Sequence, residues 1–128
     1  QFVADRDHLM AHYHERLRTL APVVYPVSAV PGCRPSWHIC VVLSDFDPAG
    51  TDRATVMRAL TAKGIGTQVH YLPVNRQPYY RQRYGKTALA GADAYYDRIL
   101  TLPLQVGMTP DDVDYVLQCL TEVLGAGG

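Results

Sequence analysis

The chain has 128 residues, a length typical of one domain. Its 48% hydrophobic and 19% charged content exclude an intrinsically disordered chain. Twelve basic and twelve acidic residues give a net charge of zero, which argues against a nucleic-acid-binding protein. No apolar stretch approaches the roughly 20 residues that span a bilayer, so we expect no membrane association.

The three cysteines are Cys33, Cys40 and Cys119, and none is in a CxxC pair. This odd set predicts free thiols in a reducing compartment, so we expect a cytoplasmic protein. Cys40 lies in an apolar run, which favours a buried, unreactive thiol over a nucleophile.

The first part of the chain predicts one helix and two strands. Apolar residues at helical spacing predict a helix over about residues 5–20, with one buried stripe formed by Leu9, Met10, Tyr13, Leu17 and Leu20. Prolines punctuate the next segment, where residues 23–27 predict an edge strand. The apolar run 37–43 predicts a central buried strand.

A second helix is expected over residues 52–63. Thr51 is a suitable N-cap. Gly64 suits the C′ position, where a left-handed residue is needed, and Ile65 can then contact Leu60 in a Schellman ending.

Residues 67–72 predict a further strand, which Pro73 ends because proline cannot continue a β-ladder. Short helices are expected over 78–84, with proline at its first position, and over 93–99. Residues 100–104 predict a short strand or extended piece.

The last helix begins after Thr109, with Pro110 at its first position and acidic residues in its first turn, and it ends at Gly125. The order of elements predicts an α+β fold: a small three- to four-stranded sheet with helices packed on one side. We expect residues 1–128 to form a single domain.

The segment that carries most chemical information runs from the predicted strand 67–72 into the loop beyond it. His70 and Tyr71 stand near the end of the strand, and the loop holds Asn75, Arg76 and Tyr79. Polar and aromatic groups that gather where a strand stops are typical of a ligand site. Arginine and tyrosine there suit a small anionic ligand such as a nucleotide diphosphate.

Two other patterns favour structural roles. His8 and His12 share a helix face with Glu15, a spacing that can bind zinc, but no further ligand is evident. His38 and Cys40 are two residues apart on one predicted strand, where packing is favoured over a nucleophile–base pair.

The sequence holds no GxGxxG motif, no P-loop and no serine or cysteine elbow. Its only lysines are Lys63, at a helix end, and Lys86, in a Gly-Lys-Thr turn. Neither is in a context that suggests a desolvated Schiff-base amine, so we expect no catalysis by this chain alone.

Several motifs of this sequence resemble motifs that occur in the same order in one protein family. They are Ser36-Trp37-His38, the stretch from Gly64-Ile65-Gly66-Thr67 through Tyr80, Leu102-Pro103-Leu104 and Thr109-Pro110-Asp111-Asp112. The chain resembles, over nearly its whole length, the C-terminal small domain of DegT/DnrJ/EryC1/StrS-type sugar aminotransferases. The VHY-x-PV core followed by QPYYR is most similar to enzymes that aminate UDP-linked 4-keto-6-deoxy N-acetylhexosamines for pseudaminic acid.

The resemblance implies one domain of a fold-type I enzyme that uses pyridoxal phosphate to move an amino group from glutamate to a keto-sugar nucleotide. In that family the cofactor lysine lies in a larger N-terminal domain, which this chain lacks, so we expect no pyridoxal phosphate bound to the chain itself. The expected partners are that large domain and, in the full-length enzyme, a homodimer mate.

By the same resemblance His70 and Tyr71 would lie near the sugar, with Trp37 and His38 close by. The loop from Asn75 to Tyr79 would face the substrate or the partner subunit. The family pattern has His-Leu where this chain has Asn75-Arg76, which leaves the sugar open. The alternative is a stand-alone α+β module that binds a nucleotide sugar, or regulates, without catalysis.

Overall fold

The computed structural model describes residues 2–27 and 29–125. Its helices and strands follow one another as α1 (Phe2–Leu17), the 3₁₀ turn η1 (Arg18–Leu20), β1 (Val24–Pro26), β2 (Cys40–Ser44), α2 (Arg53–Ala62), the 3₁₀ turn η2 (Val74–Arg76), α3 (Pro78–Tyr84), α4 (Ala90–Arg98), β3 (Ile99–Leu102) and α5 (Pro110–Leu124). This mixture confirms the predicted α+β class.

The three strands form one antiparallel sheet in the order β1-β2-β3. The edge position of β1 and the central position of β2 confirm two of the sequence predictions. The strand predicted from residue 37 instead begins at Cys40, so Trp37 and His38 precede it. In β2, Cys40 and Val42 belong to the main core, whereas Val41 alternates to the opposite face.

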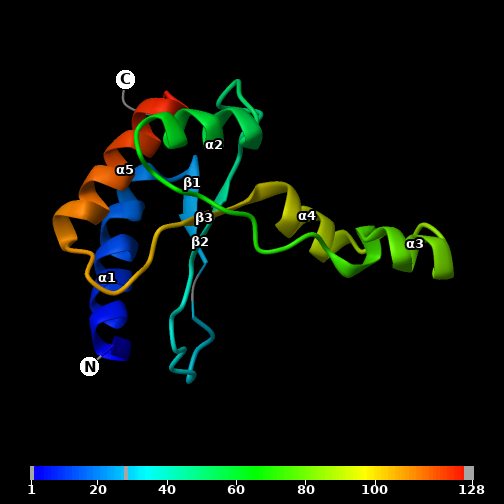
Figure 1. Cartoon of the computed structure of the whole chain (residues 1–128), viewed down its shortest axis with the longest axis horizontal. Coiled ribbons are helices and arrows are strands. Elements are labelled where there is room, and N and C mark those ends of the chain that lie inside the picture. The colour runs from blue at the N-terminus through cyan, green and yellow to red at the C-terminus, as the bar shows by residue number, and fades with distance from the viewer. Residues whose placement is uncertain (1, 28, 126–128) are drawn as a thin grey trace.

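Helices α1, α2 and α5 cover one face of this sheet (Figure 1). Helices α1 and α5 pack side by side, and α2 packs against α5. The side chains between them and the sheet are fully or almost fully enclosed; they include Tyr13, Leu17, Leu60, Val113 and Leu120. None of the helices in the described residues is long and apolar enough to cross a membrane.

The start of α2 differs from the prediction. The N-cap is Asp52, not Thr51: its carboxylate accepts hydrogen bonds from the backbone N–H and the hydroxyl of Thr55. The backbone N–H of Thr51 instead donates to the carbonyl of Phe46 at 3.2 Å, which ties Thr51 to the preceding turn.

The end of α2 confirms the predicted Schellman motif. Gly64 has φ of +79° and donates to the carbonyl of Thr61, while Ile65 donates to the carbonyl of Leu60. Ile65 and Leu60 are both buried, so this helix end joins the core.

The capping of α5 also confirms the prediction. Thr109 and Asp112 exchange hydrogen bonds in a capping box, with Pro110 at the first helical position. Gly125 ends the helix in the left-handed conformation, with φ of +66°. The six buried residues of α5 belong to the core that α1, α2 and the strands share.

Residues 72–98, here called the arm, contain η2, α3 and α4 and extend away from the three covering helices (Figure 1). Helix α3 has the predicted bounds and stops at Gly85, while α4 begins three residues earlier than the predicted 93. No residue of the arm is buried. The arm is therefore not held by a hydrophobic core of its own.

Candidate functional site

The segment that leads into the arm is not the predicted strand. Of residues 67–72, only Gln68 pairs with the sheet, through two backbone hydrogen bonds with Thr101. The prediction of a strand over 67–72 is therefore wrong, although Gln68 does lie along the free edge of β3.

The reason lies at Ile99, the residue with which a longer ladder would pair next. In an antiparallel pair, the backbone groups of Ile99 and Thr101 point to the same edge. The N–H of Ile99 is taken by the carbonyl of Tyr95 at the end of α4. Its carbonyl accepts from the guanidinium of Arg53 at 3.4 Å. The N–H of Ile99 is therefore not available for a ladder bond with the segment around His70.

His70 is fixed by a side-chain contact instead. Its Nδ1 lies 2.9 Å from the Thr101 hydroxyl. Thr101 alternates with the core residues Leu100 and Leu102, so it points to the sheet face opposite the covering helices. His70 is half-buried there, and the ring of Tyr71 meets it edge-on at 4.6 Å between centroids. Tyr71 is 75% exposed.

Arg76 is already paired within the arm. Its Nε lies 2.6 Å from Asp93, and its terminal nitrogens lie 2.9 and 3.4 Å from the two oxygens of Asp97. These bonds raise the pKa of Arg76, through Asp97 first and then Asp93. The Arg76 guanidinium and the Leu89 N–H lower the pKa of Asp93. Arg76 therefore ties η2 to α4.

Arg53 and Tyr96 complete this junction, and sequence reasoning missed both. The guanidinium of Arg53 lies 4.6 Å from the centre of the Tyr96 ring and donates to the carbonyl of Tyr96. Arg76 lies 5.1 Å from the same ring. The sequence did contain a signal for the Arg76 contact: Asp93 and Asp97 lie at i, i+4 on one helix face, a spacing that can present two carboxylates to one guanidinium.

Asn75 lies beside Arg76 at a cavity of about 350 Å³. Its amide nitrogen donates to the carbonyl of Thr87 at 2.9 Å, and its Oδ1 is buried without a hydrogen-bond partner. The other residues that line this cavity are Arg76, Arg81, Lys86, Thr87, Ala88 and Asp93. Tyr79 is exposed on α3, where its hydroxyl accepts from Arg83 at 3.3 Å.

Trp37 and His38 lie in a different part of the molecule. Trp37 is half-buried against α1, edge-on to His14 with ring centroids 5.8 Å apart, and lines a separate groove beside Cys33 and Arg34. His38 is exposed, whereas Cys40 is buried in β2, and burial raises the pKa of the Cys40 thiol to about 12. The favoured interpretation of Cys40 as an inert core thiol is confirmed.

Both lysines of the chain are exposed. Lys63 donates to Glu122 at 2.8 Å, and this bond raises the pKa of the lysine. Lys86 lines the cavity of the arm.

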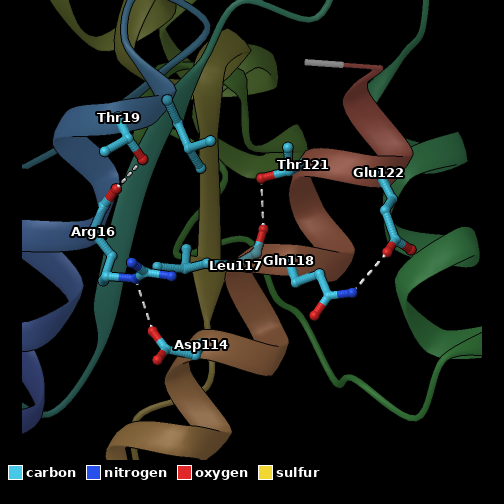
Figure 2. Close-up of a pocket in the computed structure, with 8 residues that line it drawn as sticks. Arg16, Thr19, Asp114, Leu117, Gln118, Thr121 and Glu122 are labelled. Carbon is cyan, nitrogen blue, oxygen red and sulfur yellow. Dashed lines mark hydrogen bonds and ion pairs between the residues drawn. The ribbon is translucent and has the colours of Figure 1, made fainter. Parts of the chain in front are cut away.

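A groove between α1 and α5 lies among the covering helices, and its polar groups are mostly paired with one another. Figure 2 shows Arg16 against Asp114, Thr19 against the Arg16 carbonyl, and Gln118 against Glu122. Asp114 also accepts from His12 at 3.0 Å, so His12 serves a helix–helix contact. This groove offers little to a polar ligand.

The sequence of this chain matches a family of aminotransferases. The profile of the DegT/DnrJ/EryC1/StrS aminotransferase family matches residues 1–121, and the chain belongs to this family. It is 32% identical over 122 residues to the spore coat polysaccharide biosynthesis protein SpsC of Bacillus subtilis. That alignment covers 93% of this chain but 31% of SpsC.

Solved structures show the same fold. PseC of Helicobacter pylori, an aminotransferase of pseudaminic acid biosynthesis, matches with a TM-score of 0.83 at 19% identity, over 98% of this chain and 33% of PseC. DesI, solved with its TDP-sugar product, matches with a TM-score of 0.84 at 24% identity, over 98% of this chain and 32% of DesI. The chain thus spans about a third of the length of these relatives.

Proposed function

We propose that this chain is the C-terminal small domain of a pyridoxal-phosphate-dependent aminotransferase, inactive alone, that moves an amino group from glutamate to a keto-sugar nucleotide. One observation carries the proposal: family members match almost the whole chain, yet the chain spans about a third of SpsC, PseC and DesI. The environments of Lys63 and Lys86 agree with a cofactor amine supplied by another domain.

The substrate class rests on the relatives. SpsC is named for polysaccharide biosynthesis, PseC acts in pseudaminic acid biosynthesis, and DesI was solved with a TDP-sugar. We propose a nucleotide-linked keto sugar as substrate, and UDP-linked 4-keto-6-deoxy N-acetylhexosamines are the first compounds to test because of the QPYYR motif after Val74.

His70 and Tyr71 are the residues that we propose to face the sugar. The Thr101 hydroxyl orients the imidazole through Nδ1, and Nε2 has no hydrogen-bond partner within residues 2–27 and 29–125. Tyr71 adds a largely exposed ring beside it. Trp37 and His38 stay candidates for the same substrate only if the rest of the enzyme brings their groove to it, since they share no cavity with Asn75 and Arg76.

We further propose that the large domain and a homodimer mate cover the exposed apolar side chains of the arm and its approach. These are Tyr71, Leu72, Val74, Tyr79, Tyr80, Tyr84, Leu89 and Tyr95. Monomeric proteins rarely leave so many large apolar groups unburied in one region. The same contacts would exclude water from a site of which this chain supplies one wall.

The test compares this chain with the longest reading frame that contains it. We expect the longer protein to bind pyridoxal phosphate and transaminate keto-sugar nucleotides with glutamate, and the 128-residue chain to do neither. Absence of a lysine-bearing domain from the longer frame would refute the proposal. Tight binding of UDP-sugars by the chain alone would favour the stand-alone module instead.

A further inference from the structure

Two of the cations that border the cavity of the arm form no ion pair within the described residues. Arg76, the third, is paired with Asp93 and Asp97. Arg81 and Lys86 line the same cavity, and neither forms an ion pair within residues 2–27 and 29–125. Two unpaired cations therefore border one concave surface.

Two cations at one concave surface call for a ligand with two negative charges close together. We propose that Arg81 and Lys86 bind the diphosphate of the sugar nucleotide. This inference rests on the proposed function and assigns the charge recognition to residues other than Arg76. Arg76 is then a positioning residue, which holds the loop of Asn75 against α4.

The dimensions of the cavity fit this assignment. Its volume of about 350 Å³ is at the lower end of the roughly 300–1,000 Å³ typical of ligand pockets. It can enclose part of a sugar nucleotide, so the nucleoside would extend outside. Arginine and lysine both bind phosphate oxygens, and the exposed position of this pair makes their contribution dependent on ionic strength.

The experiment uses the full reading frame that contains this chain, loaded with its cofactor. UDP, inorganic pyrophosphate and uridine are titrated calorimetrically against the wild type and the double variant Arg81→Gln, Lys86→Gln. Each lost charge-assisted contact should weaken phosphate binding about tenfold, so UDP and pyrophosphate should lose roughly 100-fold in affinity. Uridine, which has no phosphate, should bind the variant as it binds the wild type.

Arg83→Gln is the matched control, because it removes the same charge two residues further along α3. Arg83 does not line the cavity and contacts the hydroxyls of Tyr79 and Tyr84. Equal loss of UDP affinity in Arg83→Gln and the double variant would overturn the inference. So would a double variant that binds UDP normally but no longer forms the wild-type oligomer, because the two cations would then be interface residues.

The two proposals fail separately. A longer protein that transaminates keto-sugar nucleotides with unchanged phosphate affinity in the double variant would overturn this inference alone. A protein with no transaminase activity whose UDP binding is lost in the double variant, but kept in Arg83→Gln, would overturn the proposed reaction and leave the diphosphate site standing.

Discussion

The covering helices and the sheet contrast with the arm. In the first region, buried side chains from α1, α2, α5 and the strands form one core. In the arm, no residue of 72–98 is buried. Its main contacts are those of Arg76 with the carboxylates of Asp93 and Asp97. Arg53 adds contacts with the Tyr96 ring and the Ile99 carbonyl. The first region is stabilised by the hydrophobic effect, while the second is positioned by polar contacts and exposes its apolar groups.

The largest expected effect is on the free energy of unfolding, which should respond to a substitution in the core but not to one in the arm. Leu120 is fully buried in α5, and Leu89 is 49% exposed just before α4. Leu120→Ala should lower the free energy of unfolding by about 2–5 kcal/mol because it leaves a cavity, whereas Leu89→Ala should change it by less than about 0.5 kcal/mol. Urea denaturation measures both. Similar losses in the two variants would show that the arm is part of the core.

A smaller effect on stability is expected at the N-terminus of α5, where the two regions also differ. Helix α5 begins with the Thr109–Asp112 capping box, whereas α4 has Leu89 at its N-cap and no cap hydrogen bond from that side chain. Thr109→Ala should cost about 1 kcal/mol of stability, and Thr109→Ser should retain most of it. Urea midpoints of the two variants test this. A Thr109→Ser loss as large as that of Thr109→Ala would mean that the methyl group, not the hydroxyl, matters.

The sequence predicted the core region well because its signals are local. Helical spacing identified Tyr13 and Leu17, and Gly64 with Ile65 specified the end of α2 through backbone geometry alone. The wrong prediction of Thr51 as the N-cap of α2 also has a local cause. Thr51 and Asp52 are both suitable N-cap residues, but the N–H of Thr51 bonds to the Phe46 carbonyl and Asp52 caps the helix.

The candidate site was less predictable because its geometry depends on distant residues. The pattern of residues 67–72 is that of a strand, but the carbonyl of Tyr95 takes the N–H of Ile99 that this strand would need. The pairing of Arg76 with α4 was harder to predict, since Asp93 and Asp97 at i, i+4 suggest a bound guanidinium but do not say which arginine supplies it. The roles of His70, Tyr71 and Asn75 in binding stay predictions.

A third substitution tests whether Arg76 positions the arm. Arg76→Met removes the contacts with Asp93 and Asp97 while keeping an apolar stem against Tyr96. Ion pairs near the protein surface contribute little to stability, so global stability should change little. Amide hydrogen exchange of α4 should accelerate relative to α5. Arg83→Met is the control and should leave α4 unchanged; equal acceleration in both variants would remove the special role of Arg76.

The smallest effect is the pH dependence of the same contact. Arg76 and the Leu89 N–H hold the pKa of Asp93 below its ordinary value of 3.8. A carboxylate with a lowered pKa stabilises the folded state fully above its unfolded pKa, and this contribution is lost as the pH falls through the folded value. The α4 contact should therefore be constant from neutral pH to about pH 5 and weaken below about pH 4. NMR shifts of the α4 amides follow this change, and Asp93→Asn should abolish most of it. A transition that persists unchanged in Asp93→Asn would contradict the assignment of this pH dependence to Asp93.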